Sequence, residues 1–291
     1  MKNLLLFFCT LLFIPAFAQQ SSIDFIGGIS NYHGDLQPRP YTFKLSKLAY
    51  GAGISHQLGS QLSVRASFIF AKVEGDDKFQ KDQNLKSRNL RFFSQIKEFN
   101  INLQYNLMDI YTRKFTPYVF AGIGVFHFDP YIFDNLDNKV YLRPLSTEGQ
   151  GIPQYLNRKN YKLTQLNVPF GAGIRYSLNE QFDVGFEIGY RKLFTDYLDD
   201  VSKTYADYFT LKGARGQQAI NIAFRADELQ PQSYPSGGTQ RGDPRYNDWY
   251  YLTTFTLSYK FGAEPFSNGT GNGGGVGKKF KRGTACPSAK F

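Results

Sequence analysis

The sequence predicts an all-β fold, an eight-stranded antiparallel transmembrane β-barrel of the outer-membrane type, with short periplasmic turns and long extracellular loops. Three observations point to this class. Eight segments alternate between apolar and polar residues, several of them over about ten residues or more. Their apolar faces begin or end in aromatic residues, and short and long connections alternate along the chain.

The first segment predicts a cleaved signal peptide. Lys2 precedes an apolar run at 4–17, and Ala16 and Ala18 supply the small residues of a cleavage site. This run is too short for a membrane-spanning helix, which needs about 20 apolar residues. We therefore expect residues 1–18 to be removed, which leaves Cys286 as the single cysteine of the mature chain.

Eight segments have the two-residue period of a β-strand, in which alternate side chains point to opposite faces. Between residues 98 and 107 the odd positions hold Phe, Ile, Leu, Tyr and Leu, and the even positions hold Glu, Asn, Asn, Gln and Asn. The expected strands are 22–30, 48–58, 61–72, 98–107, 115–127, 166–177, 182–191 and 247–261.

Strand length and polarity distinguish a membrane barrel from a soluble β-sandwich. Soluble strands are commonly about 5–6 residues long, whereas a tilted strand that crosses a bilayer has about 9–11. The apolar faces begin or end in Tyr, Trp or Phe, as expected where an apolar band meets two aromatic girdles. We therefore assign the apolar faces to lipid and the Arg, Glu and Asn faces to the lumen.

The connections predict the orientation of the barrel, which we expect to occupy residues 19–261. Outer-membrane barrels place short turns in the periplasm and long loops outside the cell, and an even strand count then puts both termini in the periplasm. Short turns are expected at 58–60, 108–114 and 177–180, and long loops at 31–47, 73–95, 128–160 and 194–246.

Five charged side chains project into the lumen in this register. An eight-stranded barrel has an interior just wide enough to be filled by side chains. Because buried charges are normally paired, we favour a salt-bridged plug over a transport path or a proton relay. The expected lumenal charge network is Arg65, Glu98, Arg175, Glu187 and Arg191.

The sequence predicts no metal site, no cofactor and no nucleic-acid partner. Its histidines, His33, His56 and His127, lack metal-ligand spacing, and the single mature cysteine excludes a thiolate cluster. No phosphate-binding loop, dinucleotide fingerprint or nucleophile elbow is present.

Two less favoured chemical interpretations stay open. His127, with Asp129 close by at the outer end of the fifth strand, could belong to a lipid-modifying enzyme, although a rim histidine without catalytic duty is commoner. Asp196, Asp199 and Asp200 could bind Ca²⁺ through carboxylate oxygens, although their spacing matches no defined calcium loop. A solvated or salt-bridged acidic loop is the simpler interpretation.

The last thirty residues differ in composition from the barrel. Residues 262–277 are rich in Gly and Asn, which is typical of a flexible linker. A lone cysteine in an exported protein suggests intermolecular pairing or a free thiol. Our hypothesis is that the tail at 262–291 is either dispensable or tethers a periplasmic partner through a Cys286 disulfide, with a basic cluster that steers the encounter. That cluster is Lys278, Lys279, Lys281 and Arg282.

Several stretches resemble a known family. They are YHGDL at 32–36, FAGIG at 120–124, LRPLSTEGQG at 142–151, PFGAG at 169–173 and EIGYRKLFTDYLDDVS at 187–202. Together they resemble the PorG-like outer-membrane β-barrels of Bacteroidota that are associated with the type IX secretion system. The resemblance covers about residues 22–261.

This resemblance implies a non-enzymatic component of protein transport. It would link the outer membrane to a periplasmic ring made of a lipoprotein and its partner, of the PorK and PorN type, and it has no catalytic residues. The alternative is a small outer-membrane barrel that binds ligands through its outer loops or modifies lipid A.

Overall fold

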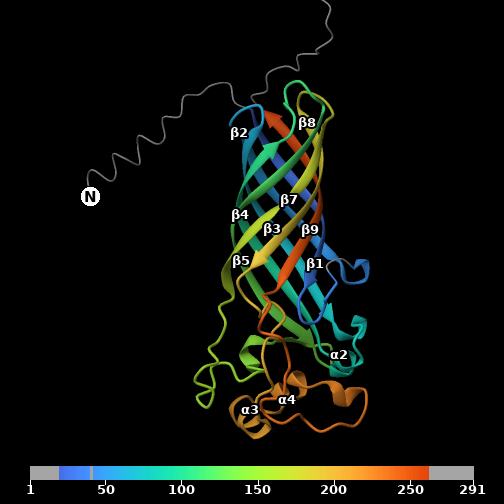
Figure 1. The fold of residues 1–291 in the computed structure, drawn as a ribbon, viewed down its shortest axis with the longest axis vertical. Helices are drawn as coiled ribbons and strands as arrows, with labels where there is room; N and C mark the ends of the chain where they lie inside the picture. Colours follow the sequence, from blue (N-terminus) through green and yellow to red (C-terminus); the bar gives the residue numbers. More distant parts are fainter. Residues whose placement is uncertain (1–19, 40–41, 262–291) are drawn as a thin grey trace, which may run out of the picture.

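The computed structural model describes residues 20–39 and 42–261. Eight long strands in this part of the chain form one closed antiparallel barrel, which confirms the predicted fold class. The expected signal peptide at 1–18 and the tail at 262–291 lie outside the described residues. The barrel strands are β1 (Ser21–His33), β2 (Lys47–Gln57), β3 (Leu62–Asp76), β4 (Arg91–Asn106), β5 (Phe115–Phe133), β7 (Thr164–Ser177), β8 (Phe182–Leu193) and β9 (Trp249–Phe261) (Figure 1).

The barrel closes through the pairing of its first and last strands. β1 pairs with β9 along its whole length, from Ser21 opposite Phe261 to His33 opposite Trp249. β4 pairs with β5, so the ring of strands has no open edge that could bind another chain. Ser21 and Phe261 therefore lie side by side, at the end of the barrel that carries the short turns.

The short turns lie at one end of the barrel and the long connections at the other (Figure 1). The turn between β7 and β8 is held by Asn179, whose Oδ1 accepts hydrogen bonds of 2.8 Å from the backbone amides of Gln181 and Phe182. The short turns occupy 58–61, 107–114 and 178–181, and the long connections occupy 34–46, 77–90, 134–163 and 194–248.

The long connections contain regular structure that the sequence analysis did not predict. Two helices begin at an aspartate whose side chain accepts a hydrogen bond from a backbone amide of the first turn: Asp82 for α2 and Asp207 for α3. Among the residues described, no helix is long and apolar enough to cross a membrane. The elements are α2 (Gln83–Arg88), α3 (Tyr208–Arg215), α4 (Gln217–Ala223) and the short strand β6 (Lys139–Tyr141), which pairs with β5.

Across the barrel wall, the apolar faces of the strands are exposed on the outside and the polar faces are buried inside. On β4, Phe99 and Leu103 are 47% and 50% exposed on the outer face, whereas Glu98, Asn100 and Asn102 are fully buried inside. An exposed apolar band of this size is unusual for a protein surrounded by water. The sequence assigned these faces correctly because alternation is a property of each strand by itself.

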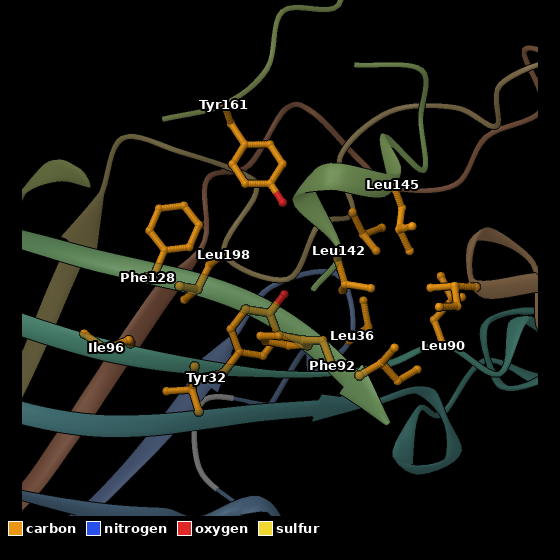
Figure 2. Packing of buried hydrophobic residues seen from close by; sticks show 14 of the residues in the cluster. Tyr32, Leu36, Leu90, Phe92, Ile96, Phe128, Leu142, Leu145, Tyr161 and Leu198 are labelled. Carbon is orange, nitrogen blue, oxygen red and sulfur yellow. The ribbon is translucent and has the colours of Figure 1, made fainter. Parts of the chain in front are cut away.

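The lumen changes from polar to apolar toward the loop end. Phe92 and Ile96 on β4 and Phe128 on β5 point inward there and pack with Tyr32, Leu142 and Leu198 from the loops and strand ends (Figure 2). In this region β3, β4 and β5 run four to seven residues beyond their predicted bounds. The inward side chains of these strand ends are mostly apolar, whereas the outward ones include Glu74, Gln95 and Lys97, so the polarity of the two faces no longer follows that of the rest of each strand.

Candidate functional site

The first lumenal ion pair joins β3 to β8 across the barrel. Arg65 Nη2 lies 2.7 Å from Glu187 Oε2 and 3.0 Å from Oε1, and Tyr118 donates a hydrogen bond of 3.0 Å to the same carboxylate. The Arg65 guanidinium also lies over the ring of Phe120, 5.6 Å from its centroid. Each charge is therefore compensated within the lumen, which offsets much of the cost of burying it.

The second lumenal ion pair joins β4 to β8. Arg191 Nε lies 3.3 Å from Glu98 Oε2, and Tyr250 donates a hydrogen bond to the same oxygen. Asn100 donates to Glu98 Oε1 over 2.7 Å, and Asn167 donates to the Tyr250 hydroxyl over 2.9 Å. These bonds cross the lumen between four strands and fill the cross-section with interacting side chains.

Arg175, the fifth residue of the expected network, contacts neither Glu98 nor Glu187 by an ion pair. Its Nη2 donates a hydrogen bond of 3.0 Å to Gln104 Oε1, and its guanidinium lies 5.2 Å from the centroid of Tyr118. The sequence analysis missed a third buried pair near the turn end, where Lys260 Nζ lies 2.7 Å from Asp183 Oδ1. The polar side of β9 contained the signal, in Lys260 itself.

The long loops form a packed cap over the barrel, and Glu148 lies at its centre. The Glu148 carboxylate is fully buried and accepts hydrogen bonds from the backbone amides of Ser202 and Lys203, at 2.9 to 3.1 Å. Arg241 Nη1 lies 3.1 Å from Glu148 Oε1. Burial alone would lower the pKa of Arg241. The negative charges of Glu148 and Asp200 together have the larger effect and raise this pKa.

Thr147, the residue before Glu148, adds another contact between the third and fourth loops. Thr147 donates a hydrogen bond of 2.5 Å to Asp200 Oδ2, and Tyr161 donates one of 2.7 Å to Oδ1. The chain can turn so tightly here because Gly149 and Gly151 adopt φ values of +83° and +70°, where a side chain would be strained. Burial raises the pKa of Asp200 to about 6, and Arg241 opposes this rise.

A buried carboxylate pair joins the end of β1 to both ends of the fourth loop. The Tyr32 hydroxyl lies 2.5 Å from Asp199 Oδ2 and 3.1 Å from Asp248 Oδ1. One hydroxyl proton serves only one of these oxygens, so the second contact needs a proton on a carboxylate. Burial raises the pKa of both aspartates well above the usual range, and their mutual repulsion raises that of Asp248 further.

The first and second loops are held by Arg88 at the end of α2. Its Nε and Nη2 lie 2.8 Å and 2.7 Å from the two carboxylate oxygens of Asp77, and it also donates to the backbone carbonyls of Asp35 and Arg241. Charge-assisted bidentate bonds of this kind are strong and directional. Asp77 thus orients Arg88 within the second loop, and Arg88 joins this loop to the first and fourth loops.

A known protein family matches most of the chain. A family model described as a domain of unknown function (DUF6089) matches residues 1–218. The chain belongs to the DUF6089 family. No curated protein sequence matches it.

Solved structures with a similar course of the chain are outer-membrane proteins at low identity. A major outer membrane protein from Thermus thermophilus has 14% identity and a TM-score of 0.42, and covers 84% of this chain and 100% of its own. Neisserial surface protein A has 7% identity and a TM-score of 0.41, with 84% and 98% covered. OprG from Pseudomonas aeruginosa has 13% identity and a TM-score of 0.39, with 84% and 95% covered. The fold of this DUF6089 protein follows from its own strand pairing.

The matched range ends within the fourth loop. It contains the residues of the cap that come from the first three loops, among them Asp77, Arg88 and Glu148. Arg241 and Asp248, which complete the cap in this DUF6089 protein, lie beyond residue 218 and reach Glu148 and Tyr32 only through folding of the fourth loop.

A cavity of about 650 Å³ opens between the first, second and fourth loops of the cap. Tyr205 and Phe224 supply aromatic rings to its wall, and Arg88 and Arg241 supply charge. Most of the remaining lining is polar and includes Asp35, Gln80, Asn84, Gln232 and Gln240.

The residues of the two open chemical interpretations contact separate partners. His127 is exposed on the outer face of β5, and its Nδ1 lies 2.9 Å from the Thr164 hydroxyl. Asp199 and Asp200 point to different partners, Tyr32 and Thr147, and Asp196 Oδ2 is buried without a hydrogen bond from a described residue. Across residues 20–39 and 42–261, no group of three or more His, Cys, Asp or Glu side chains is placed to hold a metal ion.

The expected tether residues lie outside the described residues. They are Lys278, Lys279, Lys281, Arg282 and Cys286. The described chain ends at Phe261, beside Ser21 and at the end opposite to the cap.

Proposed function

We propose that this protein is a non-conducting, non-enzymatic outer-membrane β-barrel that belongs to the type IX protein secretion machinery. Its role would be to link the outer membrane to a periplasmic ring lipoprotein and its partner, of the PorK and PorN type. The observation that carries the membrane part is the polarity of β4, with apolar side chains exposed outward and polar side chains fully buried inside. The resemblance to PorG-like barrels supports the secretion part.

The exposed apolar band supports a location in the outer membrane. The strands are 11 to 19 residues long and therefore reach or exceed the roughly 9–11 residues that a tilted strand needs to cross a bilayer. Outer-membrane barrels place their short turns in the periplasm, so the cap would face the outside of the cell. Ser21 and Phe261 would then lie on the periplasmic side.

The filled interior supports a structural role over a pore. The Arg65–Glu187 and Arg191–Glu98 pairs occupy the lumen, and the apolar cluster around Phe92 and Phe128 closes the mouth above them. A solute would have to break buried ion pairs and displace tightly packed rings to pass. Anchoring of a partner needs neither step.

The position of Phe261 supports contact with a periplasmic partner through the residues that follow it. The basic residues Lys278, Lys279, Lys281 and Arg282 would steer an acidic surface of the ring toward the barrel, because attraction between opposite charges raises association rates. Cys286 would then form a disulfide with that partner. This tether is part of the proposal.

The test is co-purification of the tagged full chain from detergent-solubilised membranes, together with secretion in a deletion strain. We expect the ring lipoprotein and its partner to co-purify, and secreted cargo to disappear from the cell surface on deletion. A Cys286→Ser variant, run on non-reducing gels, should lose a reducible high-mass band, whereas Ser288→Ala two residues away should keep it. Normal secretion in the deletion strain would contradict the proposal.

A second candidate function is ligand binding by the outer loops, which the cavity of about 650 Å³ favours. Cavities of about 300–1,000 Å³ are typical of small-molecule sites. Amide and carboxylate groups beside the Tyr205 and Phe224 rings would suit a polar, hydroxyl-rich ligand such as a sugar. Binding of an oligosaccharide panel to the purified chain, lost in Tyr205→Ala, would support this function; normal secretion with altered adhesion on deletion would favour it over the first.

A further inference from the structure

One sector of the outer barrel surface carries positive charge directly beside the apolar band. The strand register places Lys97 of β4 opposite Phe70 of β3 and His127 of β5, and places Lys72 opposite Gln95. Alternation puts Lys72 and Lys97 on the same outward face as the exposed Phe68, Phe70 and Phe99. Lys139 of β6 is opposite Phe133 of β5, and its Nζ shares the Tyr131 ring with that of Lys72. We call Lys72, Lys97 and Lys139 the rim lysines.

Two of the rim lysines lie against one pair of aromatic rings. Phe93 and Tyr131 stack with centroids 5.6 Å apart. Lys72 Nζ lies 4.7 Å from the Phe93 centroid and 5.7 Å from that of Tyr131, and Lys139 Nζ lies 3.9 Å from the Tyr131 centroid. Tyr rings and lysines prefer the interface between lipid tails and water. There the apolar stem of a lysine contacts the lipid tails while its ammonium group stays solvated.

The rim lysines have no carboxylate within 4.0 Å among the described residues. The nearby acidic residues of β3 form ion pairs with other cations. Glu74 pairs with Lys47 and Arg91, and Asp76 pairs with Lys78 and Arg91. Asp129 lies on the same face but forms no ion pair at that distance. The three rim lysines and Asp129 together carry a net charge of +2.

The like charges of the sector are also close together. Lys72 is opposite Gln95, so Lys97, two residues further along β4, is its diagonal neighbour. Such positions are about 7–8 Å apart, and like charges on adjacent strands repel each other. An anion held between the two ammonium groups would turn this repulsion into attraction.

The rest of the barrel surface does not share this feature. The outward positions of β1, β2, β7, β8 and β9 contain one Lys or Arg, the exposed Lys192 at the end of β8. Lysines at outward strand positions are therefore concentrated in the sector formed by β3, β4, β5 and β6. General solubility of the rim would not require such a one-sided arrangement.

We propose that the rim lysines bind the phosphate group of an outer-leaflet lipid, with lipid A as the source that this position fits. This inference rests on the proposed outer-membrane location, with the cap outside the cell. The phosphate would lie between Lys72, Lys97 and Lys139, and the acyl chains would run along Phe68, Phe70 and Phe99. Lysine binds phosphate as a point charge and needs no bidentate geometry, which suits a headgroup that moves in the plane of the membrane.

The experiment measures lipid binding to the full chain purified in a neutral detergent, by native mass spectrometry. The probes are diphosphoryl lipid A and the same lipid with both phosphates removed. Near a membrane surface a lysine contributes about 1 kcal/mol to the binding of an anionic lipid, so K72Q/K97Q/K139Q should weaken binding of the phosphorylated probe roughly 100-fold. The matched control is K114Q/K162Q/K192Q, which removes three exposed lysines elsewhere and should bind as the wild type does.

Each of the following results would overturn the inference. They are equal affinity for both probes, an unchanged affinity of K72Q/K97Q/K139Q, or an equal loss in the control variant. Displacement of lipid A by millimolar inorganic phosphate would reassign the site to free phosphate and would also overturn it. Heat-modifiable mobility on gels confirms that each variant is folded, so loss of binding is not loss of the barrel.

The outcome is separable from that of the proposed function. A chain that inserts and co-purifies the periplasmic ring, yet binds both probes equally, contradicts only the lipid site. A chain that retains phosphorylated lipid A but does not co-purify the ring contradicts only the secretion role.

Discussion

Arg191 and Glu98 form an ion pair inside the barrel, with Arg191 Nε 3.3 Å from Glu98 Oε2 and both side chains at most 1% exposed. The two residues are 93 positions apart in the chain, on strands that do not pair with each other. Together with Tyr250, which also donates to Glu98, they connect opposite parts of the barrel wall across the lumen.

Replacement of Arg191 by Ala should destabilise the barrel. The variant leaves Glu98 buried without its cation, and breaking a buried pair on one side costs about 3–5 kcal/mol. Urea unfolding in detergent, followed by heat-modifiable mobility, measures the loss. The double variant Glu98→Gln/Arg191→Met removes both charges and should recover part of the stability; a double variant as unstable as Arg191→Ala would count against an electrostatic origin.

Phe92→Ala and Phe99→Ala form a matched pair on β4. Phe92 is fully buried in the mouth of the barrel, and its loss should cost about 3–5 kcal/mol through the cavity it leaves. Phe99 is 47% exposed on the outer face, where detergent or lipid can fill the space, so Phe99→Ala should cost far less. Unfolding of both variants in the same detergent tests this difference, and equal losses would contradict the assignment of the two faces.

Glu148→Gln should loosen the cap and leave the barrel intact. Glu148 accepts from two backbone amides and pairs with Arg241, and hydrogen bonds to a charged group contribute about 1.5–3 kcal/mol. Limited proteolysis should cut residues 194–248 faster while heat-modifiable mobility stays the same. Glu228→Gln is the control, because Glu228 forms a surface pair with Arg225 that contributes about 0–1 kcal/mol. Equal cutting of both variants would show that Glu148 does not hold the cap.

The stability of the cap should fall as the pH rises. Burial raises the pKa of Asp35 to about 6 and that of Asp196 to about 9, and it raises the pKa values of Asp199 and Asp248 well above the usual range. Between about pH 4, the ordinary carboxylate pKa, and these raised values, the folded cap binds more protons than the unfolded chain. Their contribution is therefore fully present below about pH 4 and is lost as the pH rises toward about 9.

Amide hydrogen exchange of residues 194–248 at several pH values, corrected for the intrinsic rate, measures this loss. The variant Asp248→Asn carries no proton that can dissociate and should show a shallower pH dependence than the wild type. Asp227→Asn, on the same loop, is the control. A cap whose protection rises between pH 5 and 9 would contradict the assignment of shared protons to the buried aspartates.

The strands and their faces were predictable because both are local properties. The alternation at 98–107 identifies β4 and assigns Glu98 to one face and Phe99 to the other without knowledge of any other strand. The prediction was short by several residues at the loop ends of β3, β4 and β5. Phe92 and Ile96 face inward there while Gln95 and Lys97 face outward, so the polarity of the two faces is reversed relative to the rest of the strand.

The loops were predicted as long polar excursions, and their folding into one cap was missed. Arg88, Glu148 and Arg241 are single charges in irregular segments, with no period to reveal them. Glu148 lies within a stretch that resembles the PorG-like family, but its partner Arg241 follows 93 residues later. Even Asp199 and Asp200, which the sequence singled out together, point to different partners in the cap.

The sequence by itself determined the number of strands, the apolar and polar faces and the closed barrel, because the two-residue period is set by the backbone of each strand. Only the tertiary structure decided which lumenal charges pair, how the four loops close the mouth and where lysines gather on the rim. Those features depend on side chains brought together by barrel closure and loop folding, such as Tyr32 and Asp248, which are 216 positions apart. Their partners are chosen in space, by burial and charge, and leave no pattern along the chain.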